Sequence, residues 1–416
     1  MASKLARIVI AGGNYAGLNA LHHLYAGLLA KKPAGDTSPH PNVQITLIDR
    51  RDGFVHYIGI TRGLTEPSFG PQLWVPYKTI PWAQHNPHIG FTQATIKEIT
   101  ANAVVLENGS KVEFDYLVVA LGQSRFAPIG VSSTTQDEFV KELSESHEEI
   151  HKAQNIVVVG GGAVGVEMAA DIKCDFPEKK VSLVHSRALP IPGPFSDKFR
   201  EEVVGILQDI GVDVVLGERV IDHQPPTEDQ AASTELAARL PERVKSTGTN
   251  SVLQLSTGRK LHADWVIRCL GTRNKYSLIS LPGETPLVGP NGLKVKPTMQ
   301  LNSPLYPHIF ACGDICARDQ VKLAGVAMYG AYIAARNITR AVLGQSESQY
   351  ELADEFPSKL LLLMGKDNFA FQMGDEIWDK ERTRPFVYDD MGLDHCIRSL
   401  SLRETPAYAA LLPQPQ

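Results

Sequence analysis

The chain has 416 residues, of which 43% are hydrophobic and 21% charged, and its formal net charge is −5. This composition is typical of a soluble globular protein with two or three domains, and the acidic balance argues against a nucleic-acid partner. No run approaches the roughly 18 apolar residues that a membrane span requires.

The chain begins with a predicted β-α-β unit built around a glycine-rich turn. The apolar run 8–11 leads into GGNYAG at 12–17, here called the first glycine turn. A helix pattern over 18–30 follows, and then a buried strand at 43–49 that ends in Asp49. Such a turn lets the backbone approach a pyrophosphate at the helix N-terminus, and the acid can accept both ribose hydroxyls.

This unit departs from the usual dinucleotide fingerprint in two ways. Asn14 takes the place of the middle glycine, and asparagine tolerates unusual backbone angles better than most residues. The Pro/Gly-containing stretch 32–41 places Asp49 ~30 residues after the turn, where roughly 20 are usual. The alternative for Asp49 is a solvated acid at the end of a strand.

A hairpin pattern and a second buried strand come next. Short strands over 89–114 surround the turn Asn108-Gly109, and the buried strand 116–120 runs into Gly122. An acidic amphipathic helix over 136–154 then leads onward.

A second glycine-rich turn, GGGAVG at 160–165, follows the apolar run 156–159 and is here called the second glycine turn. A helix at 165–174 and a strand at 181–185 come after it, and the strand ends in His185-Ser186-Arg187 with no acid. An acid would repel a 2′-phosphate, whereas Arg187 can pair with one, so the pattern favours NADPH or acceptance of both nicotinamides. The alternative is an arginine that stacks on adenine or faces solvent.

Glu167 lies in the first turn of the helix that follows. The helix dipole favours an acid there regardless of function, and the side chain could equally face a bound nicotinamide. Both interpretations stay open.

The second half of the chain adds further predicted elements. A polar stretch at 221–250 is predicted to be a surface excursion, and a strand at 265–270 closes the second domain at Gly271. A short strand at 309–311 precedes Cys312-Gly313-Asp314, and a helix of small residues covers 323–343. Asp314 could bind the ribityl or phosphate end of a flavin. Lys322 is either a surface charge or a group that stabilises a reduced flavin.

Five cysteines are an odd number without a disulfide framework, which predicts a reducing, cytoplasmic setting. Cys312 and Cys316 lack the CxxC spacing of redox thiols, and no nearby pair completes a metal site, so we expect packing residues and no metal. The first strand starts close to Met1, so we expect no signal or transit peptide, and Ala2 does not match the myristoylation signal.

The predicted domains are an FAD-binding domain in two parts, 1–150 and 273–345, an NAD(P)H-binding domain at 151–272, and a C-terminal interface domain at 346–416. For the last we expect a layer over the flavin domain. A homodimer contact or peripheral contact with a membrane or lipid droplet, through Trp378 and Phe386, is the alternative.

Four segments resemble one family. They are FVHYIGITRGL (54–64), GGGAVGVEMAADIK (160–173), IFACGDICARDQVK (309–322) and LLLLMGKDNFAFQM (360–373). They are similar to the apoptosis-inducing-factor-like, ferroptosis-suppressor group of NAD(P)H:quinone oxidoreductases, within the two-dinucleotide flavoproteins. The resemblance implies an α/β fold with two Rossmann-like domains and a small α+β C-terminal domain.

The resemblance also implies site residues. His56 and Arg62 would match the histidine and arginine of the group's segment, and Lys322 would lie near the flavin ring and act with Glu167 as a catalytic residue. FAD would contact Gly12, Gly13, Asn14, Tyr15, Ala16, Gly17, Asp49, Arg50, Arg62, Ala94, Gly122, Gly313 and Asp314. NAD(P)H would contact Gly160, Gly162, Gly165, Glu167, Arg187 and Gly271.

The implied activity is hydride transfer from NAD(P)H to FAD, followed by electron transfer to a small-molecule acceptor, with a quinone favoured. Two alternatives stay open: a biosynthetic flavoenzyme acting on a specialised metabolite, and a redox-sensing flavoprotein without fast turnover. The lack of a cysteine pair in the first unit argues against a disulfide reductase.

Overall fold

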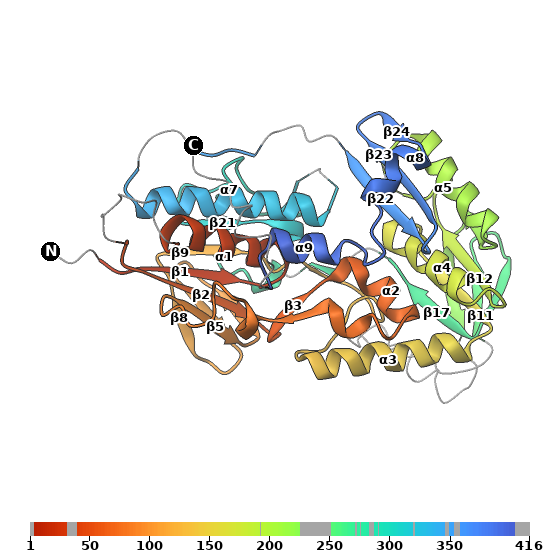
Figure 1. The fold of residues 1–416 in the computed structure, drawn as a ribbon, viewed down its shortest axis with the longest axis horizontal. Coiled ribbons are helices and arrows are strands. Elements are labelled where there is room, and N and C mark those ends of the chain that lie inside the picture. The colour runs from red at the N-terminus through yellow and green to blue at the C-terminus, as the bar shows by residue number, and fades with distance from the viewer. Residues whose placement is uncertain are drawn as a thin grey trace.

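The computed structural model describes residues 4–30, 40–191, 193–224, 251–270, 273–274, 276–282, 287–289, 291–318, 321–345, 349–352 and 358–403. Its fold is α/β, with two parallel sheets towards opposite ends of the molecule (Figure 1). Within these residues, no helix combines the length and apolar character needed to cross a bilayer.

The first sheet is a five-stranded parallel sheet in the order β21-β9-β1-β2-β5. The helices α1 (Tyr15–Leu28) and α7 (Ala324–Val342) pack against each other beside it (Figure 1). A parallel sheet is covered on both faces, which explains why its strands are nearly continuous apolar runs. Its strands are β1 (Ala6–Ala11), β2 (Val43–Asp49), β5 (Ile89–Gln93), β9 (Tyr116–Val119) and β21 (Ile309–Ala311).

The second sheet is a four-stranded parallel sheet in the order β13-β12-β11-β17. The helices α4 (Ala163–Asp175) and α5 (Asp197–Asp209) pack against it. Its strands are β11 (Asn155–Val159), β12 (Lys180–His185), β13 (Asp213–Leu216) and β17 (Trp265–Arg268). Each glycine turn follows an inner strand of its sheet, β1 or β11, and lies at the carboxyl end of the strands, where open α/β sheets bind ligands.

The remaining strands form small antiparallel sheets. They are β3 (Gly53–Val55) with β4 (Trp74–Pro76); β6 (Ile96–Ile99), β7 (Ala103–Leu106) and β8 (Lys111–Glu113); β10 (Gln123–Ser124) with β18 (Arg273–Asn274); β14 (Val220–Gln224), β15 (Ser251–Leu255) and β16 (Lys260–Ala263); β19 (Val288–Gly289) with β20 (Gly292–Leu293); and β22 (Lys359–Met364), β23 (Asn368–Met373) and β24 (Glu376–Trp378). The other helices are α2 (Ile60–Thr65), α3 (Gln136–Lys152), α8 (Lys380–Thr383) and α9 (Leu393–Ser399).

The predicted polar excursion at 221–250 begins too early. Residues up to Gln224 form the strand β14, which pairs antiparallel with β15. The rest of the predicted excursion, 225–250, lies outside the described residues. The start of the excursion is set by the pairing of β14 with β15, and the polar composition of the segment does not predict this pairing.

Of the two aromatic residues predicted to contact a partner or membrane, Trp378 packs against its own domain, whereas Phe386 is exposed. The Trp378 ring meets Phe371 edge-on with centroids 4.6 Å apart, and the Arg382 guanidinium lies 3.9 Å from the centre of the Trp378 ring. Phe386 is 47% exposed. The proposed dimer or membrane contact of this domain stays a prediction.

Candidate functional site

The first glycine turn has backbone geometry that excludes side chains at two positions. Gly12 has a φ of +99°, and a Cβ there would lie 2.4 Å from the Ala120 carbonyl oxygen. A Cβ on Gly17 would lie 1.7 Å from the Gly12 carbonyl oxygen. The turn therefore packs backbone against backbone and leads directly into the N-terminus of α1, which is the arrangement that binds a pyrophosphate.

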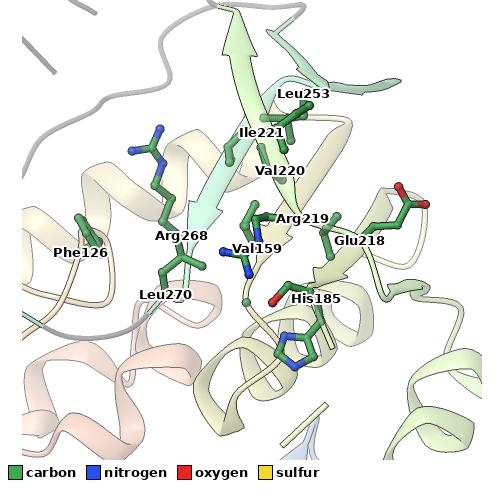
Figure 2. A pocket seen from close by; sticks show the side chains of 14 residues that line it. Phe126, Val159, His185, Glu218, Arg219, Val220, Ile221, Leu253, Arg268 and Leu270 are labelled. Atoms are coloured by element: carbon green, nitrogen blue, oxygen red, sulfur yellow. The ribbon is translucent and has the colours of Figure 1, made fainter. Parts of the chain in front are cut away.

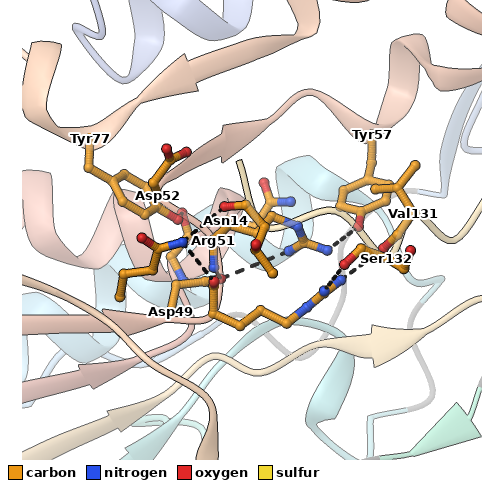
Figure 3. A network of polar contacts seen from close by, with 12 residues as sticks. Asn14, Asp49, Arg51, Asp52, Tyr57, Tyr77, Val131 and Ser132 are labelled. Carbon is orange, nitrogen blue, oxygen red and sulfur yellow. Dashed lines mark hydrogen bonds and ion pairs between the residues drawn. The ribbon is translucent and has the colours of Figure 1, made fainter. Parts of the chain in front are cut away.

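Asp49 lies at the end of β2 with its carboxylate held beside this turn (Figure 3). The Gly13 N–H donates to Asp49 Oδ2 at 2.7 Å, and the Arg51 N–H donates to Asp49 Oδ1 at 2.9 Å. The Arg51 guanidinium, 4.0 Å from Asp49 Oδ1, also donates to the Tyr57 hydroxyl. Each carboxylate oxygen keeps acceptor capacity beyond its one N–H, which suits recognition of a ribose diol.

Asn14 fits into the first glycine turn in a different way from the one predicted. Its φ of −89° is ordinary, so no unusual backbone angle is needed. Its side-chain oxygen instead accepts the Tyr15 N–H at 2.9 Å as the N-cap of α1. The Tyr15 ring packs edge-on against Phe54 with centroids 5.1 Å apart, and its hydroxyl lies 3.1 Å from His56 Nδ1.

Two further predicted FAD residues lie around Asp49. The Ala94 N–H donates to the Asp49 carbonyl at 2.8 Å, which places the end of β5 beside the acid. The Arg50 guanidinium donates to the carbonyls of Val131 and Ser132 at 2.8 and 2.5 Å, and so ties β2 to that loop. These contacts give Arg50 a structural role, and its contact with FAD stays a prediction.

The motif around Asp314 reaches the same sheet edge. Gly313 has a φ of +76°, and a Cβ there would lie 3.2 Å from the Ala16 Cβ, so this loop packs on the first glycine turn. Gly122 follows β9 with a φ of +59° and open space around its Cα. Lys322 Nζ donates to the carbonyls of Asp314, at 3.0 Å, and Cys316. Lys322 therefore stabilises this loop through hydrogen bonds, and its predicted role beside the flavin ring stays a prediction.

The second glycine turn repeats the steric pattern of the first. Gly160 has a φ of +116°, and a Cβ there would lie 2.3 Å from the Cys269 carbonyl oxygen. A Cβ on Gly165 would lie 1.8 Å from the Gly160 carbonyl oxygen, whereas Gly162 borders open space. This turn therefore also suits a pyrophosphate.

His185 performs in the second unit a task that Asp49 performs in the first. The Gly161 N–H donates to His185 Nδ1 at 3.1 Å, just as the Gly13 N–H donates to Asp49. Burial lowers the pKa of His185, and the cations Arg187 and Arg200 lower it further. A neutral imidazole thus orders the second turn without placing a negative charge at the end of β12.

A pocket of about 390 Å³ lies beyond the ends of β11, β12 and β17 (Figure 2). Its polar lining includes His185, Ser186 and Arg219, together with Arg268 at the end of β17. Arg187 is exposed at the end of β12, and its carbonyl accepts the Gly217 N–H at 2.9 Å. The loop that carries Arg219 is therefore fastened to the strand end that carries Arg187.

Sequence reasoning missed Arg219, Arg268 and the role of His185. The two arginines come from separate strands and loops, so no local pattern marks them. The visible signal was the absence of an acid at the end of β12. Gly271, predicted to close over the nicotinamide, lies outside the described residues.

Glu167 points towards the C-terminal elements, where the Leu363 N–H donates to its Oε1 at 3.3 Å. Burial raises the pKa of Glu167 to about 8, and the nearby Asp171 carboxyl adds to this rise. The contact shows a structural partner that neither sequence interpretation named. Contact with nicotinamide stays a prediction.

This raised pKa predicts how stability changes with pH. The folded chain binds the Glu167 proton more tightly than the unfolded chain, in which the pKa is 4.5. The stabilisation is complete below about pH 4.5 and is lost as the pH rises towards 8. Because the Glu167 side chain is only partly buried, we expect the effect to be about 1–3 kcal/mol.

We therefore expect the melting temperature of the wild type to fall relative to Glu167→Gln as the pH rises from 5 to 9. Thermal unfolding of both proteins in matched buffers measures this difference. Parallel curves would show that the carboxyl titrates normally.

Arg62 contacts residues of α4 and of the C-terminal hairpin. Its Nη2 donates to the Gly365 carbonyl at 3.0 Å and lies 3.4 Å from Asp171 Oδ1. The sequence predicted Arg62 as an FAD ligand; the structure shows its guanidinium between α2, α4 and the C-terminal hairpin, and its contact with FAD stays a prediction. The guanidinium lies there because α2 packs on α4, a contact between segments about a hundred residues apart that no local motif reveals.

A family model and the curated relatives indicate the type of protein, and a solved structure shows the same fold. The family model described as pyridine nucleotide-disulphide oxidoreductase matches residues 6–331. Oxidoreductase OXR1 of Ajellomyces capsulatus is 30% identical over 96% of this chain and 88% of its own, and ferroptosis suppressor protein 1 of Xenopus tropicalis is 28% identical over 87% of each. The structure of the sulfide:quinone oxidoreductase of Aquifex aeolicus shares the fold, with a TM-score of 0.63 and 16% identity over 89% of this chain and 84% of that one.

Proposed function

The chain belongs to the pyridine nucleotide-disulphide oxidoreductase family, and on that premise we propose that it is an NAD(P)H:quinone reductase. It is an oxidoreductase whose cofactors are FAD and NAD(P)H. When bound, FAD supplies the two-electron chemistry that connects NAD(P)H to the acceptor.

The state of the cysteines carries this proposal, because it argues against a disulfide as acceptor. All five cysteines are free. In each of them burial raises the pKa, well above its usual value in Cys312 and to about 12 in Cys316. A thiolate is the reactive form, so none of these thiols is activated for exchange. A small molecule that takes two electrons directly, such as a quinone, fits this arrangement.

The chain's own residues then bind and orient. The first glycine turn and Asp49 suit the FAD pyrophosphate and ribose, and the second glycine turn with His185 suits the nicotinamide dinucleotide. Lys322, fixed to the Asp314 carbonyl, would bring a positive charge to that loop.

The test separates reduction of the flavin from its reoxidation. Purified protein is mixed anaerobically with NADPH or NADH, and the loss of flavin colour is followed; ubiquinone analogues, a protein disulfide and cytochrome c are then added in turn. Rapid return of colour with quinones alone supports the proposal. Slow return with every acceptor would instead indicate a redox-sensing flavoprotein.

We further predict that Arg187 favours NADPH. With a neutral His185 at the strand end, the guanidinium of Arg187 can pair with a 2′-phosphate without competition from an acid. Arg187→Ala should lower kcat/KM for NADPH roughly ten- to a hundredfold while changing that for NADH little. Steady-state kinetics with both nucleotides measures this.

The matched control is Arg259→Ala, which removes an exposed arginine of the same domain whose ion pair is with Asp213. Equal losses with NADH and NADPH in the Arg187 variant would contradict a phosphate role.

We place the protein in the cytoplasm. Its five free thiols suit a reducing compartment. Fractionation of cells that express a tagged chain tests this and would also reveal a membrane or lipid-droplet pool.

A further inference from the structure

Three parts of the fold meet at one buried charged contact. The helix α2 belongs to the first unit, and α4 begins within the second glycine turn. The turn between β22 and β23 belongs to the C-terminal domain, and α4 packs against both α2 and β22 (Figure 1). At their junction Arg62 Nη2 donates to the Gly365 carbonyl at 3.0 Å and lies 3.4 Å from Asp171 Oδ1. The Gly365 N–H completes the cluster by donating to Asp171 Oδ1 at 3.2 Å.

We propose that Arg62 and Asp171 are positioning residues, which hold α4 and its glycine turn at the distance from the FAD unit that hydride transfer requires. The proposal rests on the proposed NAD(P)H oxidation but not on the identity of the acceptor.

The burial of the pair makes it a strict positional constraint. The side chains of Arg62 and Asp171 are 3% and 0% exposed. A buried charge needs its partner, because bulk water does not reach it to replace that partner. If α4 slid along α2, both charges would be left buried without a partner, at a large cost in free energy. An apolar contact would tolerate such a shift far better, since dispersion forces have no fixed direction.

The connection to the cofactor runs through one rigid element. Asp171 lies on α4, whose first residue, Ala163, belongs to the second glycine turn. A shift of α4 therefore moves the whole nucleotide site relative to the FAD unit. Misplacement of reacting groups by about 1 Å can slow a reaction a hundredfold, so a small change at Arg62 should affect chemistry more than binding.

The same junction contains a second, exposed ion pair that serves as a control. Lys366 Nζ, from the same hairpin, lies 2.9 Å from Glu66 Oε2, immediately after α2, but these side chains are 53% and 38% exposed. Exposed ion pairs contribute little and are screened by water. Lys366→Ala thus removes a charge from the same junction without disturbing the buried pair.

The experiment compares Arg62→Lys, Asp171→Asn and Lys366→Ala with the wild type. Four quantities are measured: FAD content, melting temperature, the dissociation constant for NADP⁺, and the rate of flavin reduction by NADPH in stopped flow, with a parallel run using NADPH deuterated at C4. The first two variants should keep FAD and bind NADP⁺ within about threefold of the wild type, but reduce flavin roughly 10- to 100-fold more slowly with a larger deuterium isotope effect. Lys366→Ala should match the wild type in all four.

Two results would overturn the proposal. Loss of FAD from Arg62→Lys would make the arginine a flavin ligand, as the sequence motif suggests. A lower melting temperature with an unchanged reduction rate in both variants would make the pair purely structural. Failure of the wild type itself to reduce its flavin with either nucleotide would instead refute the proposed function, so the two failures are distinguishable.

Discussion

Replacing Gly165 by alanine is expected to abolish reduction of the flavin by NAD(P)H while FAD remains bound. A Cβ at this position would lie 1.8 Å from the Gly160 carbonyl oxygen, well inside contact distance. The backbone of the second glycine turn would have to move, and with it the N–H groups that receive the pyrophosphate. We expect nucleotide affinity to fall by at least about a hundredfold, because the overpacking, which costs about 1–3 kcal/mol, adds to the loss of phosphate contacts.

The measurement is anaerobic titration with NADPH and NADH, monitored by flavin absorbance. The control is Gly205→Ala in α5 of the same sheet unit, where a new Cβ has no atom within 4 Å. Normal reduction in Gly165→Ala would mean that the nicotinamide nucleotide does not bind on this turn.

Replacing Gly17 by alanine should leave the protein without FAD. A Cβ on Gly17 would lie 1.7 Å from the Gly12 carbonyl oxygen, and Gly12 is itself packed against the end of β9. The first glycine turn cannot yield in either direction, so the helix N-terminus and the turn would separate. Because a tightly bound ligand stabilises the folded state, the variant should also melt at a lower temperature than the wild type.

Flavin content after gel filtration and thermal shift with added FAD measure this effect. Gly90→Ala provides the control in the same sheet, since the nearest atoms to a new Cβ there lie at 3.9 Å, an ordinary contact distance. A Gly17 variant that stays yellow would place FAD elsewhere.

Elements with strong local patterns were predicted well. The strand Val43–Asp49 and the strand Ile309–Ala311 have the predicted bounds, and α3 starts at the predicted Gln136. The helix start has a local cause, because Thr135 and Glu138 form a capping box. Other ends differ by a few residues; α1, for example, starts at Tyr15, because Asn14 caps it.

The sequence by itself determined the two glycine turns, the unlike residues that end the strands beside them, and hence two different dinucleotide sites. These features are local, since a tight turn needs glycine and a buried parallel strand needs a continuous apolar run. Only the tertiary structure decided which groups Arg62, Glu167 and His185 contact. Arg62 meets Asp171, 109 residues away, and Gly365, 303 residues away. The direction of a charged side chain depends on which distant partner compensates the cost of its burial, and that partner becomes known only when the domains pack.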